Sequence, residues 1–101
     1  MRIDVVGRHI EITDAIRTYA EEKTAKLSRY FDAIQLITCT VEPEKHNSQQ
    51  AFKVELVVDV EHHNDFVSHV VDADVYKAID AVVHKSTRQL TDFKEKFKDA
   101  R

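Results

Sequence analysis

Residues 52–61 have the sequence FKVELVVDVE, and the pattern of this segment is the strongest indication of the fold. Apolar side chains stand at Phe52, Val54, Leu56, Val58 and Val60. The positions between them, apart from Val57, are charged: Lys53, Glu55, Asp59 and Glu61. A period of two is typical of a β-strand with one face in the core and the other toward solvent. We therefore predict a half-buried strand here with a charged outer face.

The neighbouring segments complete a sheet around this strand. Residues 34–42 place Ile37, Cys39 and Val41 on one side and predict a strand, followed by a polar loop over 43–50. Residues 62–65, HHND, are typical of a hairpin turn, because Asn and Asp tolerate the left-handed backbone that such turns need. A further strand should begin at Phe66, and residues 2–6, closed by Gly7, predict one more strand.

Two helices are predicted from apolar residues spaced three and four apart. The first is expected to begin after Thr13, which is suited to cap its N-terminus, and to run to about Phe31. The second should begin after Asp72 or Asp74 and run almost to the end of the chain. Each helix has a single apolar stripe, which favours packing of both on one face of the sheet.

The order β-α-β-β-β-α predicts an α+β fold with a four-stranded sheet. Three consecutive strands can form an antiparallel meander, and the first strand can join it by a crossover through the first helix. Both helices then cover one face, and the other face stays open to solvent. This element order resembles a double-stranded-RNA-binding domain with an added strand.

Length and composition indicate one globular domain. The chain has 101 residues, of which 43% are hydrophobic and 33% charged, and we expect a single domain over 1–101. No apolar run reaches the ~20 residues that a membrane span needs, and no signal-peptide pattern is present. The single cysteine fits a reducing compartment, so we expect a cytoplasmic protein that does not bind membranes and is a monomer when free.

Charge is distributed unevenly along the chain. The formal net charge is −3, yet residues 17–29 hold four basic against two acidic side chains, and residues 84–101 hold six against three. Residues 32–72 hold two basic against eight acidic side chains. The predicted fold would thus combine basic helices with an acidic sheet, and a basic surface attracts phosphate backbones. Helix lysines also serve solubility alone, and charge does not separate the two interpretations.

Catalytic and metal-binding patterns are weak. The single glycine, Gly7, excludes glycine-rich phosphate loops. Cys39 shares the apolar side of its strand, which favours a small buried side chain over a nucleophile. His62, His63, Asp65 and His69 form the only histidine cluster, and adjacent strand residues point to opposite faces, so we expect surface histidines and no metal site. The chain is therefore predicted not to be an enzyme and to need no cofactor.

Two stretches resemble the ribosome hibernation promoting factors, a family also described as sigma-54 modulation proteins. The first is Ile10-Glu11-Ile12-Thr13 with Ala15-Ile16-Arg17, followed by Lys23, Lys26-Leu27 and Tyr30-Phe31-Asp32. The second is Asp74-Val75-Tyr76-Lys77-Ala78-Ile79-Asp80, followed by Lys85, Arg88-Gln89-Leu90, Lys94, Lys96 and Lys98. The second stretch resembles the family's D-x-Y-x-A-I-D helix entry and its K-x-x-R-Q-L helix with a lysine-rich end. Together the matches cover nearly the whole chain, so the resemblance implies a single ribosome-binding domain over 1–101, and we expect no C-terminal dimerisation domain of the kind found in the family's long form.

The resemblance implies a translation inhibitor that works by occupancy. Such proteins bind the small ribosomal subunit in the channel between head and body, where messenger RNA and the A- and P-site transfer RNAs would lie, in stationary phase or stress. We expect ribosomal RNA, and no DNA, as the partner. The RNA-facing residues carried over by the resemblance are Lys23, Lys26, Lys85, Arg88, Lys94 and Lys96, with Arg8, Arg29 and Lys98 as secondary candidates.

Two alternatives and one departure accompany this interpretation. The chain could be a generic RNA-binding module, or a protein–protein regulator that uses an apolar patch of Val57, Val67 and Val71 on the open sheet face. Asp92 stands where relatives often carry lysine, and the family is usually more basic. We therefore expect a weaker electrostatic contribution to RNA binding than is usual in the family.

Overall fold

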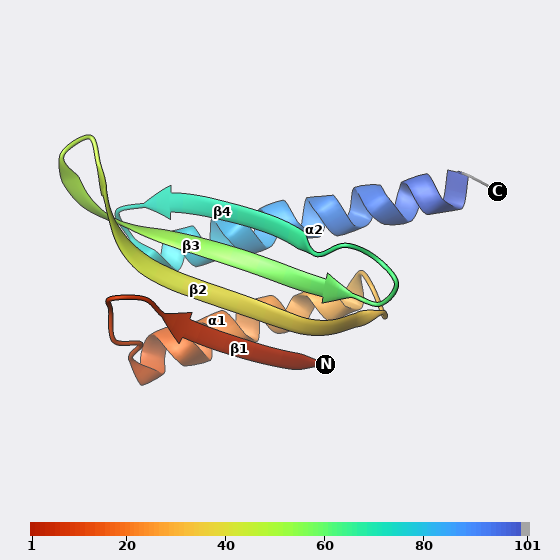
Figure 1. Cartoon of the computed structure of the whole chain (residues 1–101), viewed down its shortest axis with the longest axis horizontal. Helices are drawn as coiled ribbons and strands as arrows, with labels where there is room; N and C mark the ends of the chain where they lie inside the picture. Colours follow the sequence, from red (N-terminus) through yellow and green to blue (C-terminus); the bar gives the residue numbers. More distant parts are fainter. Residues whose placement is uncertain (100–101) are drawn as a thin grey trace.

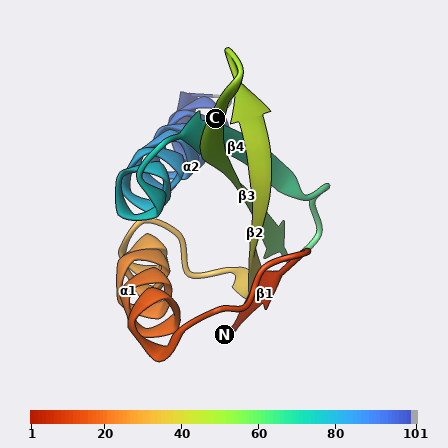
Figure 2. The same ribbon diagram turned by 90° about the vertical axis from the view of Figure 1, so that its left-hand side faces the viewer.

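The computed structural model describes the backbone of residues 1–99 and the side chains of residues 1–96. Within this part, the elements are β1 (Arg2–Gly7), α1 (Asp14–Ala25), a short 3-10 helix η1 (Lys26–Arg29), β2 (Ile34–His46), β3 (Gln49–Val60), β4 (Phe66–Asp72) and α2 (Val75–Asp99). Figure 2 shows both helices on one face of the sheet and, within the described residues, no helix on the other face. The predicted α+β class and element order are confirmed.

The sheet has the strand order β1-β2-β3-β4 (Figure 1). β1 pairs with β2 in parallel, whereas β2, β3 and β4 form the antiparallel meander that the sequence predicts. One row of paired residues runs Val5, Cys39, Leu56 and Ser68, and all four side chains are buried beneath the helices. The likeness to double-stranded-RNA-binding domains stays a prediction.

The predicted loop over residues 43–50 is wrong. β2 and β3 continue through it as a long hairpin that projects beyond the helices (Figure 1), joined by a turn of Asn47 and Ser48 with φ of 53° and 64°. Positive φ at both turn residues suits the twist of the flanking strands. Pro43 is tolerated because β1 ends opposite Val41, so β2 has no strand partner on that side beyond this point. Every residue from 43 to 50 is exposed, so no apolar alternation marked these strands.

The first helix is shorter than predicted. α1 ends at Ala25, and the chain tightens into η1, where the Tyr30 amide donates to the Leu27 carbonyl. This tighter turn places Leu27 fully in the core. Residues 26–33, which follow Ala25 up to the start of β2, contain neither glycine nor proline, so the sequence holds no stop signal for the α-helix there.

Side-chain caps fix where both helices begin. The Thr13 hydroxyl accepts the Ile16 amide at 3.2 Å, as predicted. Of the two candidate caps for α2, Asp74 is the one used, since its carboxylate accepts the amides of Tyr76 at 2.9 Å and Lys77 at 3.3 Å. Asp72 instead accepts the Asp74 amide at 2.8 Å.

The helices also hold the two edges of the sheet. Arg17 of α1 donates to the Val5 carbonyl of β1 at 3.2 Å. From α2, Lys85 donates to the His69 carbonyl and Gln89 to the Val67 carbonyl of β4, each at 3.1 Å. These contacts satisfy outward carbonyls of edge strands, which would otherwise be open to pairing with another chain. No helix within the described residues is long and apolar enough to cross a membrane.

Candidate nucleic-acid interface

A groove lies between the two helices on the side away from the sheet. Its first part, of about 270 Å³, is lined by Lys23, Lys26, Tyr30, Asp80, Val83, His84 and Thr87. Its second part, of similar volume, is lined by Arg29, Tyr30, Thr91, Lys94 and Glu95. The ring of Tyr30, 44% exposed, belongs to both parts. We call these two parts together the helix groove.

A contact between the helices sets the geometry at the start of the helix groove. The Tyr19 hydroxyl of α1 donates to the Asp80 carboxylate of α2 at 2.6 Å. This hydrogen bond, then burial and the negative charges of Asp80 and Asp74, raises the pKa of Tyr19 to about 12. Lys23 packs its half-buried side chain here, with its ammonium 5.2 Å from the centre of the Tyr19 ring. The Tyr19–Asp80 bond therefore fixes the spacing of the two helices that frame the groove.

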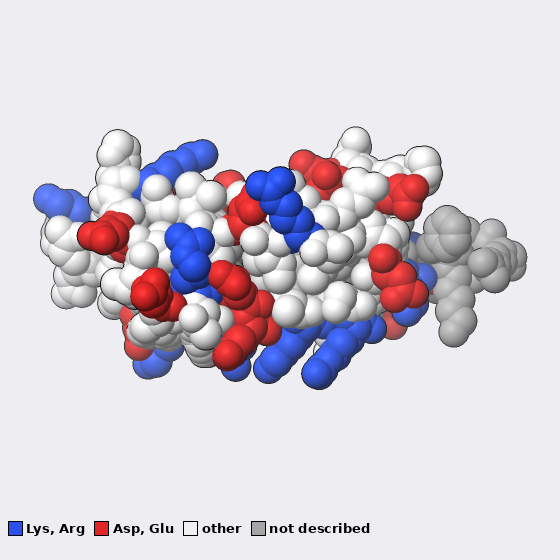
Figure 3. Space-filling model, turned by 90° about the horizontal axis from the view of Figure 1, so that it is seen from below, with Lys and Arg blue, Asp and Glu red and all other residues white. Residues whose placement is uncertain are grey.

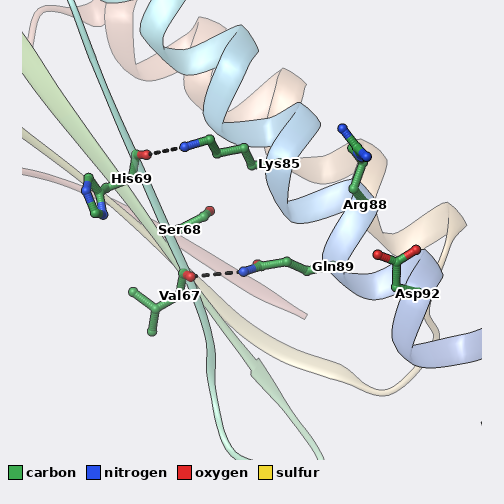
Figure 4. Close-up of a pocket in the computed structure, with 7 residues that line it drawn as sticks. All are labelled: Val67, Ser68, His69, Lys85, Arg88, Gln89 and Asp92. Carbon is green, nitrogen blue, oxygen red and sulfur yellow. Dashed lines mark hydrogen bonds between the residues drawn. The ribbon is translucent and has the colours of Figure 1, made fainter. Parts of the chain in front are cut away.

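A second hollow, of about 440 Å³, lies between α2 and the edge strand β4. It is lined by Val67, Ser68, His69, Lys85, Arg88, Gln89 and Asp92 (Figure 4). Lys85 and Gln89 reach across it to carbonyls of β4, whereas Arg88 and Asp92 lie farther from the strand. Ser68 and Ser86 share a buried hydrogen bond of 2.9 Å beneath it. We call this hollow the edge cleft.

The two sides of the molecule differ in how their charges are partnered. Among residues 1–96, the structure shows three ion pairs: Arg2–Asp4, Glu42–Lys53 and Glu61–His62. The first two lie on the open sheet face and the third in the turn after β3, so none involves a lysine or arginine of either helix. Figure 3 shows basic side chains projecting along its lower margin, which is the helix side, while both signs mix above. Helix cations without an ion-pair partner are free to bind phosphates.

The predicted RNA-facing residues fall into two groups. Lys23, Lys26, Arg29 and Lys94 come together in the helix groove, and Lys85 and Arg88 come together in the edge cleft. Arg8 follows β1 and Lys96 lies beyond both hollows on α2; both are exposed and neither joins a group. The side chain of Lys98 lies outside the described residues.

Several lining residues were missed by the sequence reasoning. His84, Thr87 and Thr91 lie between the basic residues of α2, on the stretch that faces α1. Helical spacing from Lys94 would have suggested Thr87 and Thr91, because residues three or four apart share a face. Gln89 carried no charge signal, and its role at the β4 edge depends on a tertiary contact.

Cys39 lies in the core, whereas His62 and His63 lie in the exposed turn after β3. Cys39 is fully buried among apolar side chains, as expected, and burial raises the pKa of its thiol to about 12. Among the described side chains, no group of three or more His, Cys, Asp or Glu is placed to hold a metal ion. His63 is an exposed residue of the turn, as expected, and in addition stacks on Phe66 with ring centres 4.6 Å apart.

This geometry defines a small α+β domain that presents two cation-lined hollows on and beside its helices. The chain belongs to the Sigma 54 modulation protein / S30EA ribosomal protein family, whose model matches residues 3–98. The family resemblance drawn from the sequence is thereby confirmed.

Relatives and solved structures match over nearly the full length. The ribosome hibernation promoting factor of Escherichia coli K12 is 33% identical, with 97% of this chain and 98% of the relative covered. That of Azotobacter vinelandii is 36% identical, with 95% and 85% covered. The N-terminal domain of Thermus thermophilus Protein Y has a TM-score of 0.77 and 34% identity, with 92% and 99% covered. A ribosomal subunit interface protein from Coxiella burnetii, at 24% identity and a TM-score of 0.81, shares the fold, with 94% and 99% covered.

Proposed function

We propose that this chain is a ribosome hibernation factor that inhibits translation by occupancy and not by catalysis. It binds the small ribosomal subunit in the decoding channel and blocks the binding of messenger and transfer RNA. The observation that carries the proposal is the similarity, over nearly the full length of both chains, to proteins named ribosome hibernation promoting factors. The helix cations that have no ion-pair partner among the described residues support it, because ribosomal RNA presents phosphates at high density.

In the proposed mechanism, the helices bind phosphates and the body of the domain fills the channel. Phosphate contacts from the helix groove and the edge cleft fix the orientation of the domain. The contributing side chains are those of Lys23, Lys26, Lys85, Arg88, Lys94 and Lys96, with Arg8, Arg29 and Lys98 adding to them. Once the domain is seated, a messenger or transfer RNA is excluded because two bodies cannot occupy the same volume. The acidic side chains of the sheet repel RNA phosphates, so the open sheet face is oriented away from the RNA.

Lys85 has two roles in this proposal. Its ammonium donates to the His69 carbonyl at the β4 edge, yet an ammonium has three donors and can bind a phosphate oxygen at the same time. Arg88, one turn farther along α2, has no hydrogen bond or ion pair recorded among the described residues and offers its full guanidinium. Arg88 is thus the cleaner probe of phosphate binding, because its replacement leaves the sheet edge intact.

Sucrose-gradient sedimentation with purified small subunits tests the proposal. We expect the chain to travel with the small subunit at low salt, to leave it at high salt, and to be displaced by messenger RNA together with initiator transfer RNA. Binding to duplex RNA without binding to subunits would favour a generic RNA-binding module. Sedimentation that survives high salt and depends on Val57, Val67 or Val71 would favour a protein partner on the open sheet face.

A further inference from the structure

An aromatic cluster lies at the end of the molecule where the turn after β3 meets the second half of α2. The rings of Phe31 and Phe93 lie 5.5 Å apart, and the His63 ring meets Phe93 edge-on at 4.5 Å. His63 also stacks in parallel on Phe66. These rings come from three separate segments of the chain, and the steric mechanism above makes no use of them.

The cluster borders a hollow of about 270 Å³, which we call the aromatic pocket. It is lined by Phe31, Glu61, His62, His63, Phe93 and Lys94. Aromatic walls of this kind can stack a flat heterocycle. Glu61 and Lys94 add a carboxylate and an ammonium, so the pocket combines aromatic surface with one acceptor group and one cation.

The polar groups of the aromatic pocket favour a ligand that donates hydrogen bonds. The His63 Nδ1 lies 2.5 Å from the Asn64 carbonyl, which can only accept, so Nδ1 is the donor of this hydrogen bond and its proton is not available to a ligand. The Glu61 carboxylate is 54% exposed and its one short contact is with the more exposed His62, at 3.3 Å. Its two oxygens can therefore turn to a ligand at little cost.

The aromatic pocket and the helix groove share a lining residue. Lys94 lines both the pocket and the second part of the groove, and Tyr30 joins that part to the first. A single RNA strand whose phosphates follow Lys26, Arg29 and Lys94 would thus arrive at the pocket. Phosphates bound along the groove leave the bases to be recognised elsewhere, and an unpaired base is the part of RNA that aromatic side chains stack on.

We propose that the aromatic pocket binds one unpaired guanine of a single-stranded RNA segment, with Lys94 on its phosphate and Glu61 on its base edge. Guanine presents two adjacent donors, N1–H and the N2 amino group, which match the two oxygens of a carboxylate. Adenine, cytosine and uracil each place an acceptor beside their donor on that edge, and an acceptor would face the Glu61 charge. This inference rests on the proposed function, since ribosomal RNA would supply the guanine.

Nuclear magnetic resonance titration of the whole chain with guanosine monophosphate tests the proposal. Inosine monophosphate, which lacks the N2 amino group, and uridine monophosphate are the comparison ligands. We expect guanosine monophosphate to shift the ring resonances of Phe31, His63 and Phe93 and to bind about tenfold more tightly than either comparison ligand. Glu61→Gln should remove this preference, and Glu44→Gln, on the exposed end of β2, should retain it.

Equal binding of the three nucleotides, or equal behaviour of the two variants, would overturn the proposal. Shifts confined to residues outside the pocket would overturn it as well. Sedimentation with small subunits separates this result from the proposed function. A wild-type chain that sediments but shows no guanine preference contradicts the pocket alone, whereas one that prefers guanine but never sediments contradicts the hibernation role alone.

Discussion

The helix side and the open sheet face use their charged side chains differently. On the sheet face, Arg2 pairs with Asp4 and Lys53 with Glu42, at 3.1 and 3.8 Å. On the helix side, basic residues line hollows without such pairs, and Lys23 lies over a tyrosine ring instead. Although the net charge is −3, the cations that are least neutralised by neighbouring acids therefore lie together on the helix side.

For an RNA-binding surface, the arrangement of charged side chains therefore matters more than the net charge of the chain. Local ion pairs satisfy the sheet face, so it has little left to offer a phosphate. Among the described residues, the helix side has cations without an ion-pair partner beside concave surface, where a nucleic acid backbone can lie. Substitutions on each side can test whether the helix side binds RNA and the open sheet face does not.

The largest effect is expected from reversing charges on the helix side. Lys26→Glu with Arg88→Glu should weaken binding to the small subunit by about 100-fold, because two phosphate contacts become repulsions. Arg2→Glu with Lys53→Glu changes the net charge by the same amount on the sheet face and should change affinity by less than about threefold. Fluorescence anisotropy of labelled protein with purified subunits measures both.

Equal losses in the two double variants would mean that total charge, and not its placement, controls binding. Lys85 stays unchanged in this experiment because its ammonium also serves the β4 edge. Circular dichroism confirms that both variants fold, since all four residues are on the surface.

A core substitution separates folding from surface effects. Cys39→Ala should lower the free energy of unfolding by about 1–2 kcal/mol, because a small cavity opens beneath the helices. Subunit affinity at a temperature where the variant stays folded should match the wild type, since neither hollow includes Cys39. Urea denaturation gives the first value. A loss of affinity in the folded variant would show that core packing controls the helix side.

Removing an acid from the edge cleft should strengthen binding. Asp92 lines the cleft beside Lys85 and Arg88, so Asp92→Asn should raise subunit affinity by about threefold to tenfold at low salt. Asp59→Asn, on the sheet face, is the matched control and should have no effect. If both variants bind equally more tightly, the cleft has no special role.

The smallest effect concerns pH. Because the pKa of Tyr19 is raised from 10.0 to about 12 in the folded chain, ionisation favours unfolding. The stability from this group is complete below pH 10 and is lost as pH rises toward 12. Tyr19→Phe should lack this part of the alkaline loss, as thermal unfolding of both proteins between these pH values would show. Identical alkaline slopes would mean that the Tyr19–Asp80 bond does not form in solution.

The sequence predicted the fold wherever burial imposes a pattern. Alternation at Val54, Leu56 and Val58 marked β3, and Thr13 marked the start of α1, because these signals are local. The hairpin around Asn47 extends beyond the core, and its strands are exposed on both faces, so no hydrophobic period marked them. The end of α1 was misplaced because Leu27 enters the core through a tightened turn without a stop residue.

The sequence predicted which basic residues belong to the candidate site but not how they are grouped in space. Family resemblance pointed to the lysines and arginines, but their division into a groove and a cleft depends on how α1 and β4 pack against α2. The roles of Tyr30 and Gln89 depend on the same contacts and have no charge signal. Likewise, His63 gained aromatic partners only because the turn folds back toward Phe93.

The salt dependence of subunit binding tests the central claim most directly. Affinity of the wild-type chain, measured by anisotropy from about 50 to about 200 mM salt, should fall about a thousandfold if some six phosphates are contacted. The helix-side double variant should show a shallower slope, and the sheet-face double variant should keep the wild-type slope. An affinity that does not change with salt across this range would contradict the claim that the helix cations bind the phosphates of ribosomal RNA.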